Sequence, residues 1–116
     1  MTEIDWQSEL TRAALPQAVL AILSVDRQHG YAMIEILRNH GFVRIKGGTL
    51  YPLLRRFEEQ GLVNHVWEHE AAGPGRKVFA LTARGVEEID RSIATWNSMN
   101  DTLATLRRND GTHDDV

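Results

Sequence analysis

Apolar residues recur at helical spacing in three short segments before residue 62. The first begins at Pro16 and is apolar on nearly every side, which is typical of a central helix, and proline favours the first helical position. The second spans residues 31–40 and the third spans residues 49–60, and each is followed by a glycine, Gly41 or Gly61, that favours a helix end. The third helix should bury one stripe, made of Leu50, Leu53, Leu54 and Phe57.

The pattern changes after residue 61. Residues 62–69 and 76–81 are β-prone, and residues 71–75 between them are turn-forming, so the sequence predicts a β-hairpin. Residues 26–30 are polar and predict a simple connection between the first two helices. Thr82 is suited to cap a last helix. The apolar residues of that helix fall at the a and d positions of a heptad and are Val86, Ile89, Ile93, Trp96 and Leu103. Asn100 is a polar residue at an a position of the same heptad.

This order of elements predicts an α+β fold, mainly α with a small β-hairpin, arranged as a winged helix-turn-helix over residues 15–81. Residues 1–14 should form a helical arm, residues 82–108 a dimerisation helix, and residues 109–116 a disordered tail. The apolar stripe of the last helix extends beyond a core that is already closed, so it must be buried against something else. In a short chain the simplest partner is a second copy, which predicts a homodimer whose interface contains the five heptad residues and the arm.

Composition is that of an ordinary globular protein. The chain has 116 residues, of which 42% are hydrophobic and 25% charged, enough for one folded domain with a projecting element. It contains no cysteine, which excludes disulfides, thiolate zinc sites and a cysteine nucleophile. The first residues lack the features of a secretory signal, and no run of 18 apolar residues occurs. We therefore expect a cytoplasmic protein without membrane contact.

Charge is distributed unevenly. The net charge is −3, yet seven of the 13 Lys and Arg residues lie in two windows that contain no acid, residues 42–57 and 76–84. The predicted third helix and the return strand of the hairpin fall in these windows, and such elements enter the major groove and contact phosphates in DNA-binding proteins. On charge alone, a solvated basic face explains the clustering equally well.

Several motifs together make the chain resemble the PadR family of transcriptional regulators. They are Gly30-Tyr31-Ala-Met-Ile, the run from Gly48 to Glu58, Gly61-Leu62-Val63, Gly75-Arg76-Lys77 and Leu81-Thr82-Ala-Arg-Gly85, and the resemblance covers residues 14–107. It implies a repressor that binds an inverted-repeat DNA operator. By resemblance, the third helix is the recognition helix. The resemblance also implies roles for single residues: Tyr31 at the start of the second helix, Thr49 and Tyr51 on phosphates, Arg55 and Arg56 at the groove or its flank, and Arg76 and Lys77 on the wing. For the two tyrosines, half-buried packing is the alternative.

The chain departs from the family at the start of the third helix. The family usually has Ser-Pro there, whereas this chain has Lys46 and Gly47. The substitution removes a hydroxyl cap and places a cation beside the positive end of a helix dipole. A bound phosphate would offset that cost, so we expect Lys46 to contact DNA.

Trp96 raises the question of an effector. In relatives with a single short C-terminal helix, a matching tryptophan lines a pore at the dimer centre that takes flat aromatic compounds. The resemblance therefore implies a small-molecule site formed by Leu15, Ile93, Trp96, Asn100 and Leu103. The alternative is an interface tryptophan with no ligand.

Two other classes of function have some support in the sequence. The best candidates for an enzyme or metal site are His65, Glu68, His69 and Glu70, but their spacing is not the His-Glu-x-x-His of a metal-binding helix. On a strand His65, Trp67 and His69 share one face, which favours polar residues on a strand surface over the alternative of an adventitious metal site. We expect no catalysis, no metal and no cofactor. A winged helix that serves only as an interaction or ligand-binding module is the second alternative, supported only by the acidic net charge.

Overall fold

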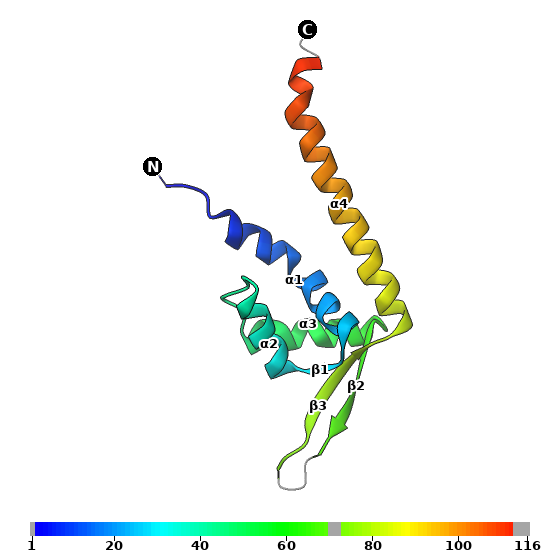
Figure 1. The fold of residues 1–116 in the computed structure, drawn as a ribbon. Helices are drawn as coiled ribbons and strands as arrows, with labels where there is room; N and C mark the ends of the chain where they lie inside the picture. Colours follow the sequence, from blue (N-terminus) through cyan, green and yellow to red (C-terminus); the bar gives the residue numbers. More distant parts are fainter. Residues whose placement is uncertain (1, 70–72, 113–116) are drawn as a thin grey trace.

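The computed structural model describes residues 2–69 and 73–112. The elements follow one another as α1 (Trp6–Val25), β1 (Gln28–His29), α2 (Gly30–Asn39), α3 (Gly47–Glu59), β2 (Val63–Glu68), β3 (Arg76–Leu81) and α4 (Ala83–Thr112) (Figure 1). The strands form one antiparallel sheet in the order β1-β3-β2. Three helices followed by a hairpin and a long helix make a winged helix, so the predicted α+β class is confirmed.

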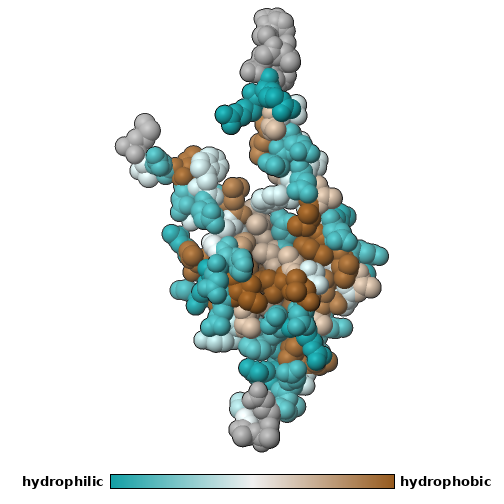
Figure 2. Space-filling model, in the orientation of Figure 1, coloured by the Kyte–Doolittle hydropathy of each residue, from teal (hydrophilic) through white to brown (hydrophobic). Residues whose placement is uncertain are grey.

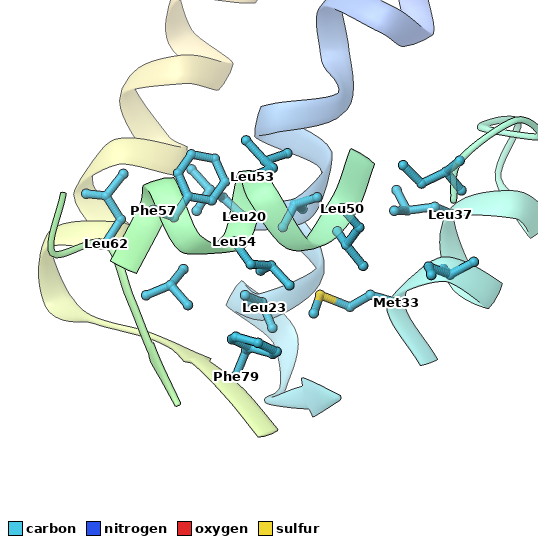
Figure 3. Packing of buried hydrophobic residues seen from close by; sticks show 14 of the residues in the cluster. Leu20, Leu23, Met33, Leu37, Leu50, Leu53, Leu54, Phe57, Leu62 and Phe79 are labelled. Carbon is cyan, nitrogen blue, oxygen red and sulfur yellow. The ribbon is translucent and has the colours of Figure 1, made fainter. Parts of the chain in front are cut away.

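The core lies where α1, α2 and α3 meet the sheet. Figure 3 shows side chains from all three helices and from β3 pointing into one space. The predicted stripe of α3 is buried there, with Leu50 fully enclosed. It packs in one cluster with Val19, Leu20, Leu23, Met33, Leu37, Leu62 and Phe79, among others. This core fixes the orientation of α3, because the face of α3 opposite the stripe must then point outward.

Local signals set the ends of α2 and α3. Gly41 and Gly61 follow these helices with φ angles of 100° and 76°, a backbone region that favours glycine. The hairpin also follows the expectation, with Val63 opposite Leu81 and Glu68 opposite Arg76. Residues 28–29, predicted as part of a polar connection, instead form β1, with Gln28 opposite Phe79. The free edge of β3 decides this pairing, and the local pattern carries no sign of it.

The first helix begins earlier than predicted. Its start is Trp6, not Pro16, and Asp5 caps it by accepting a hydrogen bond from the backbone N–H of Ser8 at 3.1 Å. The Ser8 hydroxyl also donates to Asp5 at 2.8 Å. This side-chain hydrogen bond, more than any other influence, lowers the pKa of Asp5 below 3.8. Pro16 therefore lies inside α1, and most of the expected arm 1–14 belongs to the same helix as the core segment.

The last helix also differs from expectation at two places. It continues to Thr112, so residues 109–112 are helical and not disordered, while residues 113–116 lie outside the described residues. Ile89, expected at the dimer interface, is 5% exposed and belongs to the core of the chain itself. Its position near the start of α4, where the helix still touches the body, explains the difference (Figure 1).

Thr82 and Gly85 join α4 to the winged body. The Thr82 hydroxyl donates to the Gly61 carbonyl at 2.7 Å and accepts from the Gly85 N–H at 3.0 Å, which confirms the predicted cap. A Cβ at Gly85 would lie 2.2 Å from the Leu62 carbonyl oxygen, so only glycine allows this close approach. Beyond the junction α4 projects, and the radius of gyration of 18.3 Å exceeds the value of about 13 Å for a compact chain of this length.

No helix within residues 2–69 and 73–112 is long and apolar enough to cross a membrane.

Candidate nucleic-acid interface

The outward face of α3 carries cations. Arg55 and Arg56 are exposed, and across residues 2–69 and 73–112 neither forms a hydrogen bond or an ion pair. Tyr51 lies one turn before Arg55, and residues four apart in a helix share a side. Two guanidinium groups held in water without an acidic partner suit a polyanion, because little internal bonding must be broken when they bind.

The start of α3 lacks a side-chain cap, as its sequence predicts. Lys46 occupies the cap position with an extended backbone and makes no capping hydrogen bond. Its carbonyl accepts from the N–H groups of Thr49 and Leu50 at 3.0 Å each. Both Lys46 and Thr49 are exposed. Both residues therefore lie at an accessible helix start, as expected. Their contact with phosphate stays a prediction.

Tyr51 packs across two glycines. A Cβ on Gly30 would lie 2.4 Å from the Tyr51 hydroxyl, and one on Gly47 would lie 3.2 Å from its ring. The Tyr51 side chain is 43% exposed, so its ring is packed while part of it faces solvent. Tyr31, in the first turn of α2, is more open at 67%. Gly30 and Gly47 thus leave the room that the Tyr51 ring occupies between α2 and α3.

A hollow joins the tyrosines to the wing. Its volume is about 240 Å³, and it lies between the start of α2, α3 and the hairpin strands. Four of the predicted DNA-binding residues, drawn from three separate motifs, line it together: Tyr31, Tyr51, Arg76 and Lys77. The remaining lining residues are His29, Gly30, Trp67, Gly75 and Phe79. We call this the aromatic hollow.

Trp67 was missed as a candidate site residue. It stands opposite Lys77 in the hairpin, and the Lys77 ammonium lies 5.9 Å above the centre of its ring. The ring is also stacked near His69, with centroids 6.5 Å apart and planes at 24°. The side chain is 57% exposed. The signal in the sequence that could have found it is the position of Trp67 on the first strand of the predicted hairpin, whose return strand carries Arg76 and Lys77.

Thr49 belongs to a different hollow. That space, of about 260 Å³, lies between the first half of α1 and the α2–α3 loop, and Arg12 and Arg44 also line it. Arg38 shapes the same loop, because its guanidinium donates twice to the Ile45 carbonyl, at 3.2 and 2.9 Å. The sequence pattern predicted neither the place of Arg12 and Arg44 in this hollow nor the hydrogen bonds of Arg38 to the loop. The basic residues at this end of α3 are therefore separated from the aromatic hollow.

Comparison with known proteins identifies the family. Residues 19–91 match the family described as Transcriptional regulator PadR-like family. This chain belongs to the PadR-like family of transcriptional regulators. Membership of this family implies that the PadR-like regulator controls transcription by binding DNA.

Individual relatives agree with the assignment. The regulator is 36% identical over 78 residues to the transcriptional regulator Rv3488 of Mycobacterium tuberculosis. The matched region covers 66% of this chain and 70% of that protein. It is 34% identical over 76 residues to the transcriptional regulator YqjI of Escherichia coli, covering 64% of this chain but only 35% of that protein. The crystal structure of a PadR family transcriptional regulator from Eggerthella lenta superposes with a TM-score of 0.78 at 34% identity, over 86% of this chain and 87% of that one.

The histidines of the wing have structural partners in this PadR-like regulator. His65 Nδ1 is paired with a carboxylate oxygen of Glu58, which ties β2 to the end of α3. Within the described residues no group of three or more potential metal ligands occurs. Glu70, the fourth member of the cluster considered above, lies outside those residues.

The expected effector residues do not converge in one protomer. Trp96 lines a hollow with Gln17, Arg91 and Ser92, among others, whereas Leu15 lines the separate hollow beside Arg44. Asn100 and Leu103 lie further along the exposed part of α4. A pocket formed by these five residues of the PadR-like regulator would therefore need a second copy.

Proposed function

We propose that this PadR-like regulator binds an inverted-repeat DNA operator as a homodimer and represses transcription by blocking access of the polymerase. The observation that carries the proposal is the outward face of α3, where exposed Arg55 and Arg56 lack partners among the described residues. Tyr51, one turn before Arg55 on the same helix, lines the aromatic hollow. The width of α3 suits the major groove, and the wing lies beside α3, where it can contact the flanking DNA backbone.

Exposed apolar side chains on α4 support a dimer. Ile93, Trp96 and Leu103, predicted at the interface, are 44%, 37% and 63% exposed in the single chain, and Val86 is exposed as well. Trp6 and Leu10 at the start of α1 add to this surface. Figure 2 shows brown apolar surface running onto α4. Burial of this stripe against a second copy places two α3 helices at half-sites about one helical turn, or 34 Å, apart.

The residue roles follow from position. Arg55 and Arg56 face the groove, where an arginine can hold a guanine edge with two hydrogen bonds. Lys46 and Thr49 at the start of α3 would contact phosphates. Around the aromatic hollow, phosphates would be contacted by Tyr31, Tyr51, Arg76 and Lys77. Loss of a base-reading arginine should cost about 1 to 3 kcal/mol and relax specificity at one base pair.

A flat aromatic effector at the dimer centre is the second part of the proposal. Leu15, Ile93, Trp96, Asn100 and Leu103 from both copies would surround it. Such a compound changes DNA affinity only if it binds two dimer states with unequal affinity. Quenching of Trp96 fluorescence by planar aromatic compounds tests the idea, and its absence with every compound tried, in an intact dimer, would count against it.

A titration against DNA tests the main proposal. The duplex upstream of the protein's own gene is bound in competition with a shuffled duplex at two salt concentrations, and the mass of the free protein is measured by light scattering. Specific binding that survives the higher salt, by a dimer, is expected. Equal binding to both duplexes, or none, would instead favour an interaction or ligand-binding module.

A further inference from the structure

The aromatic hollow combines an exposed indole with a cation and two phenols. Trp67 is 57% exposed, and Lys77, Tyr31 and Tyr51 line the same space of about 240 Å³. We propose that this hollow seats one deoxyribose–phosphate unit of the DNA backbone, with the Trp67 ring against the sugar and Lys77 on the phosphate. The inference rests on the DNA-binding function proposed above.

Trp67 is not required by the packing of the hairpin. On its own face of the strand, Phe79 is buried and fills the space beneath the sheet, whereas the Trp67 ring projects beyond it. Its described ring neighbours are His65, met edge-on with centroids 6.5 Å apart, and His69 near the end of the hairpin. Its exposed indole also lines the aromatic hollow, so this part of the ring faces a space that a ligand can enter. The ring is therefore available to a ligand.

The chemistry of the hollow matches a nucleotide backbone. A deoxyribose ring presents apolar C–H groups, and the phosphate beside it needs cations and hydrogen-bond donors. Among the residues that the structure describes, none that lines the hollow is acidic. Within the described part of the chain the hydroxyls of Tyr31 and Tyr51 have no hydrogen-bond partner, so both can donate to a phosphate.

Trp67 also positions the cation. The Lys77 ammonium lies 5.9 Å above the indole centre, within the range in which the ring attracts a cation. The lysine stem is thereby held against the wall of the hollow, with its charge toward the space between wing and α3. A free lysine on a strand edge would instead sample many rotamers, and its ordering would oppose binding.

The location of the hollow fits the path of the DNA strand. Tyr51 forms one wall and precedes Arg55 by one turn on the same side of α3. When α3 enters the major groove, the backbone that borders the groove on this side passes between α3 and the wing. The hollow occupies this place.

Fluorine NMR tests the contact without altering Trp67. The chain has three tryptophans, so protein labelled with 5-fluorotryptophan gives three signals, and Trp67→Phe assigns one of them. Addition of duplex DNA should shift the Trp67 signal much more than those of Trp6 and Trp96. The shift should occur with operator and with shuffled duplex at low salt, because a sugar–phosphate contact does not depend on sequence.

Affinity measurements provide the second arm. Trp67→Leu should weaken binding about tenfold on every duplex, whereas Trp67→Phe, which keeps a ring, should lose less than threefold, in line with stacking contacts to nucleic acid. Lys77→Gln should lower the salt slope of log K by about 1. Val66→Ala, an exposed residue on the opposite face of the same strand, is the matched control and should bind like the parent.

The outcomes separate this inference from the function on which it rests. If the parent protein shows no salt-dependent DNA binding, the proposed function itself fails. If the parent binds DNA but the Trp67 signal stays in place, or Trp67→Leu binds as tightly as Val66→Ala, the hollow does not seat the backbone. The NMR arm also decides the matter if Trp67→Leu does not fold.

Discussion

The winged body buries its large apolar side chains, whereas the projecting part of α4 leaves them exposed. In the body, Leu50 and Val19 are completely enclosed. Along α4 beyond Ile89 the large apolar residues stay open, and Leu103 and Leu106 are 63% and 64% exposed. Both regions are helical, and both carry apolar residues at helical spacing. The apolar stripe of the body is therefore buried within the chain, and the apolar stripe of α4 is not.

The comparison separates two tasks. The body closes its own core and so holds α3 and the wing in a fixed relation, which the DNA surface requires. The projecting helix contains many Ser, Thr and Asn residues, which favour helix weakly, and an isolated helix of this kind is marginal in water. In the proposed dimer a second copy would stabilise this helix, and the length of the helix would set the separation of the two bodies. Variants that affect one region and spare the other test this division.

The largest effect should come from a matched pair of leucine truncations. Leu50→Ala removes a fully buried side chain and should lower the free energy of unfolding by about 2 to 5 kcal/mol. Leu103→Ala removes the same atoms from an exposed position on α4 and should leave the unfolding of a dilute monomer nearly unchanged while weakening the dimer. Chemical denaturation and analytical ultracentrifugation measure the two quantities. Equal destabilisation of a monomer by both variants would contradict the division.

The junction between the regions should be nearly as sensitive. Gly85→Ala places a Cβ 2.2 Å from the Leu62 carbonyl oxygen, so the backbone of α4 must move, at a cost of about 1 to 3 kcal/mol. Gly48→Ala is the control, because a Cβ there meets no atom within 4 Å, and alanine favours a helix. Thermal unfolding should show a lower midpoint for Gly85→Ala only. A Gly85→Ala protein as stable as the parent would show that the junction is loose.

The cap at Thr82 should have a smaller effect. Thr82→Val keeps the shape of the side chain but removes the hydroxyl that bridges the Gly61 carbonyl and the Gly85 N–H. We expect a loss of about 1 kcal/mol, as for other helix caps. Hydrogen exchange should accelerate at the first turn of α4 and not in α3. Uniform acceleration over both helices would mean that the cap stabilises the whole body and not the junction.

The smallest effect concerns the start of α1. The Ser8 hydrogen bonds lower the pKa of Asp5, so its contribution to stability is complete above the ordinary value of 3.8 and is lost as pH falls through the lower folded value. NMR titration should show Asp5 protonating together with faster exchange of the Ser8 amide. Asp5→Asn, which caps without titrating, should show no such transition in this range. A transition at the ordinary pKa in the parent would contradict the cap.

The sequence predicted those features that depend on neighbouring residues. Helices α2 and α3, the glycines that end them, the hairpin and the Thr82 cap all follow from spacing and turn chemistry within a few residues. The residue types of the candidate DNA surface were likewise visible, because Arg55, Arg56 and Lys77 stand in acid-free windows, and the family resemblance implied roles for them. Local pattern determines these features because their hydrogen bonds and buried stripes are formed within the segment itself.

Tertiary structure decided the rest. β1 forms because it pairs with the open edge of β3. Ile89 is a core residue because α4 leaves the body only after it. Trp67 enters the candidate site because the fold brings the wing against α2 and α3, where it meets Tyr31 and Tyr51. These are contacts between segments distant in sequence, and periodicity within one segment cannot report them. The chain's own pattern thus determined which elements form, and packing determined which side chains share a surface.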